Sequence, residues 1–161
     1  MEMNTRIQVE HPVTEMVTRL DLIKKQIEIA AGLPLLITQE NVRFEGHSIE
    51  CRINAESTKN NFMPTNGTID ALHVPGGFGI RFDSHMYEGY KLPIYYDSMI
   101  GKLIVWAPTR DEAIAKMKRA LDEIKIEGFD TNIGFQHDLI RSEPFISGIY
   151  NTSTIEGMLK K

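Results

Sequence analysis

The fold is decided by the stretch HSIECRINAE, residues 47–56, in which polar and apolar side chains alternate. Successive side chains of a β-strand point to opposite sides of the sheet, so this period of two predicts a strand with one polar face. The polar face comprises Ser48, Glu50, Arg52, Asn54 and Glu56, and the other face comprises His47, Ile49, Cys51, Ile53 and Ala55. Cys51 therefore points to the apolar face, where we expect an inert core thiol.

Three further strands are predicted downstream, at residues 68–74, 79–83 and 102–107. Clusters of Pro, Gly and Asn separate them and favour antiparallel hairpins. The run Pro75-Gly76-Gly77-Phe78-Gly79 could suggest a phosphate loop. Such a loop needs a helix after it, whereas a strand is predicted here, so we interpret the run as a hairpin.

Two helices are expected after these strands. Thr109 and Glu112 form a capping box, and Gly128 is expected to end the first helix. Its apolar positions recur every three or four residues at Ile114, Met117, Leu121 and Ile124. A second, short helix is predicted from about residue 132 to 141, stopped by Pro144. The order of elements predicts an α+β fold, an antiparallel sheet with packed helices rather than βαβ repeats.

The first ten residues, MEMNTRIQVE, also alternate with a period of two and have a more strongly charged face. This predicted strand carries Glu2, Asn4, Arg6, Gln8 and Glu10 on one side. Such groups are costly to bury without a partner or a ligand, and an anionic, metal-bearing substrate would supply one. His11-Pro12 should end the strand, because proline restricts the preceding residue and cannot donate to a ladder.

A helix should follow the first strand. Thr18 with Asp21 resembles a capping box, and Gly32-Leu33-Pro34 is a stop signal. Residues 34–45 show no sustained period, and we place a domain boundary there, between domains at residues 1–40 and 46–157. Because the chain opens with its most charged strand and no element to pair it, we expect it to be part of a longer protein.

Composition excludes several classes of protein. The 161 residues are 42% hydrophobic and 25% charged, enough for a real core. A net charge of -4 without a basic run argues against nucleic acid as the main partner. No apolar stretch reaches the roughly 20 residues of a membrane span, and no secretion signal is evident, so we expect a cytoplasmic protein that does not bind membranes. The single cysteine cannot form an internal disulfide.

Two long motifs resemble the biotin carboxylases: EMNTRIQVEHPVTE at residues 2–15 and GHSIECRINAE at residues 46–56. The runs PGGFG at 75–79 and YYDSMIGKL at 95–103 fit the same family. The resemblance extends over essentially the whole chain but covers only the family's C-terminal portion. It therefore implies that residues 1–40 are the end of an ATP-grasp domain, whose glycine-rich lid loop and phosphate-binding lysines would precede this chain.

The resemblance implies a chemistry and a role for each residue of the motifs. Biotin carboxylases use ATP, a divalent metal and bicarbonate to carboxylate biotin. By similarity, Glu2 and Asn4 would be Mg²⁺ or Mn²⁺ ligands, with Glu2 also beside ATP. Arg6, Gln8 and the Val9 backbone would hold bicarbonate, Arg6 through its planar fork. Glu10 would be the base that deprotonates bicarbonate, and Arg52 would bind biotin and stabilise its enolate-like oxygen. Arg6, Glu10 and Arg52 are thus the catalytic candidates.

Two physical considerations bear on these assignments. In one straight strand, Glu2 and Glu10 would lie roughly 26 Å apart, so the segment must bend if both serve one small substrate. Without the resemblance, an alternating charged face is most often a solvated sheet face. Arg52 alone would be better explained by a structural ion pair with Glu50 or Glu56. If the rest of the ATP-grasp sheet is absent, residues 1–18 should be poorly ordered or rearranged.

The resemblance also implies partners and leaves alternatives open. It implies a homodimer that pairs near Phe78 and Arg81, a biotin carboxyl carrier protein, and in some relatives carboxyltransferase subunits. The parent could serve acetyl-CoA carboxylase in fatty acid synthesis, or a propionyl-CoA, pyruvate or urea carboxylase. The chain by itself is expected to be inactive, and a different reading is that it is a scaffold and dimerisation module.

Overall fold

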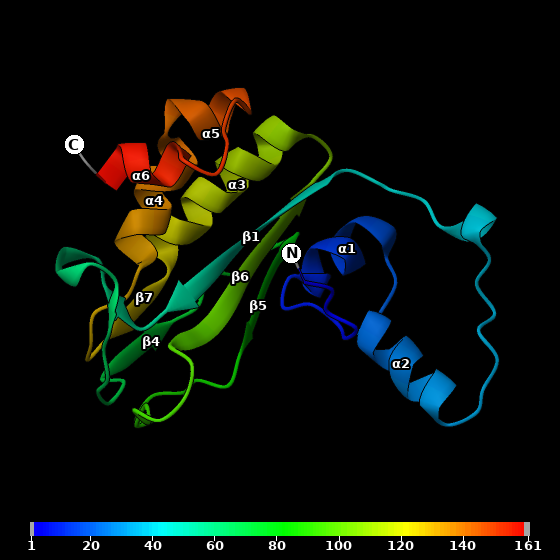
Figure 1. Cartoon of the computed structure of the whole chain (residues 1–161), viewed down its shortest axis with the longest axis horizontal. Helices are drawn as coiled ribbons and strands as arrows, with labels where there is room; N and C mark the ends of the chain where they lie inside the picture. Colours follow the sequence, from blue (N-terminus) through cyan, green and yellow to red (C-terminus); the bar gives the residue numbers. More distant parts are fainter. Residues whose placement is uncertain (1, 160–161) are drawn as a thin grey trace.

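A three-stranded antiparallel sheet forms the centre of the molecule, which the computed structural model describes for residues 2–159 (Figure 1). Its strand order is β1 (His47–Asn54), β6 (Met99–Ala107) and β5 (Ile80–Ser84). The strand predicted from the alternation at residues 47–56 is therefore confirmed, and it pairs with β6 from His47 opposite Ala107 to Asn54 opposite Met99. The α+β class with an antiparallel sheet is also confirmed.

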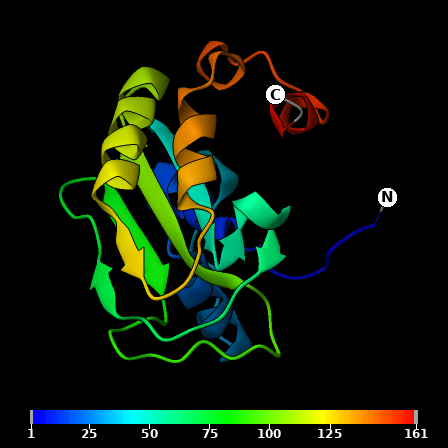
Figure 2. The same ribbon diagram turned by 90° about the vertical axis from the view of Figure 1, so that its left-hand side faces the viewer.

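The apolar face of the sheet builds the core against α3 (Arg110–Glu123) and α4 (Ile133–Arg141). Figure 2 shows these helices side by side along the sheet. The alternation appears in the burial of β1, since Ile49, Cys51 and Ile53 are buried while Arg52 is exposed. The core also includes Leu103, Val105, Ala113, Ile114, Met117, Ala120 and Leu121.

The start of α3 confirms the predicted capping box: the Thr109 side chain accepts from Glu112 N, and the Glu112 side chain accepts from Thr109 N. The end differs from the prediction. The helix stops at Glu123 and β7 (Lys125–Glu127) follows, so Gly128 does not end it. Gly128 instead allows a close backbone approach, because a Cβ there would lie 1.8 Å from the carbonyl oxygen of Thr68.

The connections differ from simple hairpins. The strand β4 (Ala71–His73) pairs with β7, whereas β5 pairs with β6, so residues 75–79 link two different sheets and the predicted hairpin is wrong. A third small sheet pairs β2 (Glu56–Ser57) with β3 (Met63–Pro64), which flank the 3-10 helix η2 (Thr58–Asn60). Pro144 does not simply stop α4; it lies in the first turn of α5 (Glu143–Ser147), whose N-cap is Ser142. The chain then forms α6 (Thr154–Leu159).

The N-terminal segment departs most from the sequence-based expectation. Residues 2–10 form no strand, because no neighbouring strand completes a ladder. His11-Pro12 begins α1 (His11–Thr18) rather than only ending an extended run, and proline is favourable in the first turn, where its missing N–H has no helical partner. The disorder or rearrangement expected for residues 1–18 is not seen in α1, which packs against β1 and β6.

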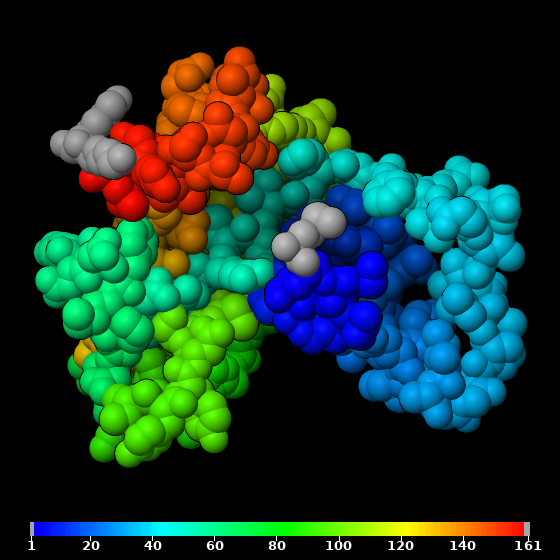
Figure 3. Space-filling model, in the orientation of Figure 1, coloured from blue at the N-terminus to red at the C-terminus, as the bar shows by residue number. Residues whose placement is uncertain are grey.

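The helix predicted between Thr18 and Gly32 is confirmed, but it starts later than predicted. In α2 (Leu22–Ala30), Asp21 is the N-cap and accepts from Lys24 N at 2.8 Å. Thr18 belongs to the last turn of α1, where its hydroxyl donates to Thr14 O, so the Thr18 and Asp21 capping box is wrong. Residues 31–46 form the predicted irregular connection, with one 3-10 turn, η1 (Gln39–Asn41), and stand out as an arm at one side of the molecule (Figure 3). Within residues 2–159, no helix is long and apolar enough to cross a membrane.

Candidate active site

The polar face of the sheet lies opposite α3 and is partly covered by α1 (Figure 1). Pairing places Arg52, Lys102 and Asp83 in one row across the three strands. The next row contains Glu50, Ile104 and Arg81. Residues directly opposite each other share a face, so five charged side chains converge here beneath the first turn of α1.

Glu10 and Arg52 meet on this face, although 42 residues separate them. Arg52 Nη2 donates to Glu10 Oε2 at 2.8 Å. Glu10 occupies the N-cap position of α1, and Arg52 projects from β1. The ion pairs of Arg52 with Glu50 or Glu56 considered from the sequence are wrong, since Glu56 accepts from Asn54 and Ser98 instead.

The exposure of this pair favours a functional over a structural role. The side chains of Arg52 and Glu10 are 49% and 55% exposed. Ion pairs so open to water contribute only about 0–1 kcal/mol, because solvent screens them and ordering two side chains costs entropy. Both groups therefore remain accessible to a small substrate, with a base and a cation in direct contact.

Lys102 adds a second cation that the sequence analysis did not single out. Its Nζ donates to the carbonyl oxygen of Val9 at 3.0 Å and lies 3.9 Å from Asp83 Oδ2. The side chain is only 12% exposed. Lys102 thus fastens the turn that carries Glu10 to the sheet. The sequence predicted a strand at residues 102–107, but the row with Arg52 depends on strand register, which the sequence pattern alone does not fix.

Glu50 lies beside these groups in an unusual environment. Its Oε2 is buried and has no hydrogen-bond partner. Burial raises the pKa of Glu50 above its ordinary value, and the nearby carboxylate of Glu10 adds to this effect. The positive charges of Lys102, Arg52 and His11 act in the opposite direction without cancelling it. The site therefore holds one exposed carboxylate, Glu10, and one half-buried carboxylate that resists ionisation.

A separate network docks α1 onto the sheet. Arg81 Nη1 donates to the buried Glu15 Oε2 at 2.7 Å, while its Nε and Nη2 donate to the two oxygens of Asp83 at 2.7 Å each. Glu15 Oε1 accepts from the backbone N–H of Leu22 at 2.7 Å. The hydrogen bonds that Arg81 donates to Asp83, and secondly to Glu15, raise the pKa of its guanidinium. Glu15 therefore links α1, the start of α2 and β5.

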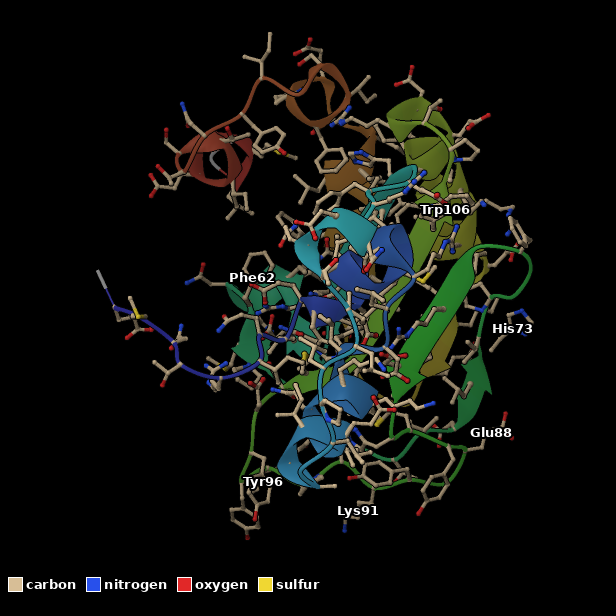
Figure 4. The ribbon with its side chains drawn as sticks, turned by 90° about the vertical axis from the view of Figure 1, so that its right-hand side faces the viewer. Phe62, His73, Glu88, Lys91, Tyr96 and Trp106 are labelled. Carbon is tan, nitrogen blue, oxygen red and sulfur yellow. The ribbon has the colours of Figure 1, made fainter. Side chains whose placement is uncertain are left out.

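The far end of α1 is held by Trp106, labelled in Figure 4. The guanidinium carbon of Arg19 lies 4.0 Å from the centre of the Trp106 ring, and the indole N–H donates to Glu45 O at 2.7 Å. Glu45 N in turn donates to Val17 O at 2.8 Å. Both ends of the short helix α1 are thus attached to the sheet, and this attachment fixes Glu10 at its N-terminus.

The remaining predicted site residues lie apart from the Glu10 and Arg52 contact. Glu2, Asn4 and Arg6 are exposed on the coil that leads away from the body (Figure 2). Arg6 Nη1 donates only to the neighbouring Ile7 O at 3.2 Å, and Gln8 Nε2 donates to Arg6 O at 3.3 Å. Asn4 and Arg6 line a groove of about 710 Å³ with α2 and residues 35–42. Among residues 2–159, no hydrogen bond or ion pair joins Arg6 to Glu10 or Arg52.

The donors on this coil suit a hard metal ion. Glu2 offers a carboxylate and Asn4 an amide oxygen, the ligand types of Mg²⁺ and Mn²⁺. Within the described chain, no group of three or more His, Cys, Asp or Glu side chains could hold a metal. The carboxylate of Glu2 and the amide oxygen of Asn4 suit a cation such as Mg²⁺, which takes few protein ligands and completes its shell with phosphate and water oxygens.

The other reactive side chains are occupied structurally. Cys51 is buried in the core, and burial raises the pKa of its thiol to about 12, in agreement with the inert role expected for it. His137 lies 3.0 Å from Asp122 and 3.3 Å from Asp138, which is local bonding. Burial and the charge of Arg110 lower the pKa of His47. These groups do not contribute to the charged face beneath α1.

Comparison with known families gives two matches along the chain. Residues 50–157 match the family described as biotin carboxylase C-terminal domain. Residues 1–38 match the family described as carbamoyl-phosphate synthase L chain, ATP binding domain. The second match agrees with the expectation that the chain begins with the end of an ATP-grasp domain.

Individual relatives agree with these matches. Biotin carboxylase 1 of Bacillus subtilis is 60% identical over 156 residues, which cover 97% of this chain and 35% of that protein. A second relative is the biotin carboxylase domain dimer of 2-oxoglutarate carboxylase from Hydrogenobacter thermophilus, which was solved with MgADP, ADP and bicarbonate. Its structure superposes on this chain with a TM-score of 0.94 at 51% sequence identity. The match covers 97% of this chain and 34% of that one. The biotin carboxylase subunit of a pyruvate carboxylase gives a TM-score of 0.94 at 50% identity, with 98% and 35% covered. The chain thus spans about a third of the length of these relatives.

Proposed function

This chain belongs to the biotin carboxylase C-terminal domain family, and on that premise we propose that it supplies the bicarbonate and biotin residues of an ATP-dependent biotin carboxylase. The observation that carries the proposal is the 2.8 Å contact between Glu10 and Arg52. It joins the motif at residues 2–15 to the motif at residues 46–56 in one accessible site. The two family matches, which leave residues 39–49 between them, support a boundary between an ATP-grasp end at 1–40 and a C-terminal domain at 46–157.

In the proposed reaction, Glu10 acts as the base that accepts the proton of bicarbonate. The Glu10 carboxylate is exposed and in contact with the Arg52 cation, so a small substrate can reach the group that is to accept its proton. Arg6, Gln8 and the Val9 backbone hold the bicarbonate oxygens. Lys102 keeps the Val9 turn against the sheet and so positions Glu10. Removing the proton makes bicarbonate the nucleophile for phosphoryl transfer.

Arg52 serves the second half of the reaction. Deprotonation of the ureido nitrogen places negative charge on the ureido oxygen, and a guanidinium within reach stabilises that oxygen. ATP with its divalent cation would supply the activating phosphoryl group when bound. Glu2 and Asn4 would hold Mg²⁺ or Mn²⁺ beside it, and Arg6 would then turn from the groove along α2 toward Glu10. This turn of Arg6 is part of the proposal, since in the structure its Nη1 donates to the neighbouring Ile7 O.

We also propose a biological setting for the chain. We place the chain in a cytoplasmic enzyme that works with a biotin carboxyl carrier protein, as in the acetyl-CoA carboxylase of fatty acid synthesis. Related chains belong to 2-oxoglutarate and pyruvate carboxylases, so a keto-acid acceptor is the alternative. The acceptor binds carboxyltransferase subunits rather than this chain. Bicarbonate and a dimer are named for the Hydrogenobacter relative, which supports bicarbonate as substrate and a homodimer.

The proposed dimer contact involves Phe78. This ring is 84% exposed at the tip of the turn between β4 and β5. Lys116 and Arg119 of α3 donate to Phe78 O at 3.0 Å and to Gly76 O at 3.2 Å, so the turn is held in place with its ring outward. Arg81, by contrast, is engaged with Glu15 and Asp83 within the chain. We therefore favour Phe78 over Arg81 as the contact.

The test is transfer of labelled bicarbonate carbon to free biotin by the full-length protein that carries residues 1–161. We expect biotin-dependent ADP release together with acid-labile label on biotin, both requiring Mg²⁺ or Mn²⁺. ATP cleavage without labelled biotin, or label on biotin without ATP, would contradict the proposal. Glu127→Gln, at an exposed carboxylate remote from the site, serves as the matched control for Glu10→Gln.

A further inference from the structure

The outer edge of β1 is closed by a side chain of α4. β1 pairs with β6 on one side only, so the backbone groups of Arg52 and Asn54 on the other side need partners. Asn132, the N-cap residue of α4, supplies them. Its Nδ2 donates to Arg52 O at 3.1 Å, its Oδ1 accepts from Asn54 N at 2.9 Å, and its own N–H donates to Asn54 O at 3.0 Å.

Asn132 is well placed to hold this edge rigidly. The residue is 4% exposed, so water does not compete for its amide. Gln136, one turn later on α4, also donates to Arg52 O, at 3.3 Å. The preceding residues are fastened to the same region, since Asp130 Oδ2 accepts from Ser57 Oγ at 2.7 Å and Asp130 O accepts from Thr65 Oγ1 at 2.7 Å.

The edge needs this support at Arg52 in particular. The register of β1 against β6 shifts between Ile53 and Asn54, which is the geometry of a β-bulge. A bulge interrupts the ladder and changes the direction of nearby side chains. The residue left unpaired is Ile100 of β6, so regular pairing is interrupted directly after Ile53, one residue beyond Arg52. Among the described residues, the hydrogen bonds from Asn132 span this point, from Arg52 O to Asn54 N.

The Arg52 side chain has little else to hold it. It is about half exposed, and its ion pair with Glu10 is the one side-chain hydrogen bond that it makes within residues 2–159. Its guanidinium lies at the end of a long flexible stem, so a small shift of the backbone moves it relative to a substrate. A misplacement of about 1 Å can cost on the order of a hundredfold in rate.

We propose that Asn132 is a positioning residue, which holds the backbone of Arg52 so that its guanidinium meets the ureido oxygen of biotin. The inference rests on the proposed function of Arg52. It predicts that loss of the Asn132 amide impairs the biotin half-reaction while the bicarbonate half-reaction, which depends on Glu10, continues. A residue that only stabilised the fold would lower both in step with the amount of folded protein.

The experiment compares Asn132→Ala, Asn132→Asp and Gln136→Ala in the full-length enzyme, with two rates and a melting temperature for each. One rate is bicarbonate-dependent ATP cleavage without biotin; the other is kcat/KM for free biotin. We expect Asn132→Ala to lower kcat/KM for biotin roughly ten- to a hundredfold and to change ATP cleavage less than about threefold. Asn132→Asp keeps the acceptor for Asn54 N and should lie between wild type and Asn132→Ala. Gln136→Ala should have the smallest effect, because Asn132 still donates to Arg52 O.

Two further variants separate the possible failures. Asn151→Ala removes an exposed asparagine near α6 and should leave both rates unchanged. Arg52→Gln should show the same uncoupling as Asn132→Ala, more strongly. If the enzyme fails to carboxylate biotin at all, the proposed function falls and this inference with it. The other case is that Arg52→Gln uncouples the two rates, whereas Asn132→Ala lowers both rates equally or leaves both unchanged. In that case the proposed function stands and the positioning role of Asn132 is wrong.

Discussion

At the scale of single residues, the site depends on two carboxylates in different surroundings. Glu10 is half exposed and in contact with Arg52, whereas Glu50 lies deeper with a buried, unbonded oxygen. Burial raises the pKa of Glu50 above its ordinary value, and groups with perturbed pKa values commonly lie at functional sites. Lys102 lies among them and also ties Val9 to the sheet.

Glu50→Gln should stabilise the chain at neutral pH. Burial raises the pKa of Glu50, so the folded chain holds this proton more tightly than the unfolded chain does. Below the ordinary carboxyl pKa both states are protonated and the residue costs nothing, whereas above the raised pKa a charge must be buried. We expect the melting temperature to rise by a few degrees at pH 7 and the difference to vanish near about pH 4.

The charged and titratable groups that face Glu50 are Lys102, Arg52, Glu10 and His11. Their charges also affect the pKa of Glu50 and therefore the expected change in melting temperature. The control is Glu127→Gln, which removes an exposed carboxylate. If Glu50→Gln lowers the melting temperature at pH 7, attraction by Lys102 and Arg52 outweighs the cost of burial, and the environment inferred for Glu50 is wrong.

At the scale of elements, α1 converts an open sheet face into a site. It is short, eight residues, and such a helix is marginal without tertiary contacts. One face of α1 is held by the contact between Glu15 and Arg81, and its C-terminal end by the contact between Arg19 and Trp106. These two contacts therefore decide where Glu10 lies. The register shift between β1 and β6 and the attachment of β1 to α4 decide where Arg52 lies.

Arg81→Met should detach α1 from the sheet. The change leaves the carboxylate of Glu15, which is only 8% exposed, without its charged partner. We expect the free energy of unfolding to fall by about 2–3 kcal/mol. This is less than for a fully buried pair, because the Arg81 side chain is about a third exposed to solvent. Urea denaturation measures it. Glu123→Gln, which breaks the exposed pair with Arg119 and leaves the hydrogen bond from Arg119 to Gly76 O, should cost about 0.5 kcal/mol. Equal costs for the two variants would mean that Arg81 does not dock α1.

Much of the C-terminal domain could be predicted from the sequence, because its signals are local. The alternation at residues 47–56 and the Thr109 and Glu112 box each determine an element without reference to distant residues. The first strand failed for the opposite reason: alternation shows which face is polar, but a strand also requires a neighbour, and residues 2–10 have none. The Glu10 and Arg52 contact, and the row with Lys102, depend on helix docking and register, which no local pattern encodes.

At the scale of the whole molecule, the residues of the proposed site lie in two parts of the chain that differ in how they are held. Its core, sheet and α3 form a platform that carries Arg52, the residue proposed to act on biotin, while Glu2, Asn4 and Arg6 lie on an exposed coil without sheet partners. The chain also spans only about a third of its relatives. The sheet that carries Arg52 is therefore more completely built than the site proposed for ATP and its metal ion at residues 2–6.

The 161-residue chain alone should not turn over ATP. Phosphoryl transfer requires a preorganised grip on the phosphates, and a coil that carries two metal donors does not provide one. Purified chain with ATP, Mg²⁺, bicarbonate and biotin should release no ADP above the buffer background. Biotin- and bicarbonate-dependent ADP release from the pure chain would refute this expectation. It would show that residues 2–10 assemble a site by themselves.

The central claim is that Glu10 and Arg52 touch each other yet serve different halves of one reaction. The most direct test measures bicarbonate-dependent ATP cleavage and biotin carboxylation in full-length Glu10→Gln and Arg52→Gln. Glu10→Gln should lower ATP cleavage by about 10²- to 10⁴-fold, as expected for loss of a positioned base, and carboxylation with it. Arg52→Gln should spare ATP cleavage far more than carboxylation. If Arg52→Gln abolishes ATP cleavage as completely as Glu10→Gln, the division of labour is wrong and the ion pair works as a single unit in the bicarbonate step.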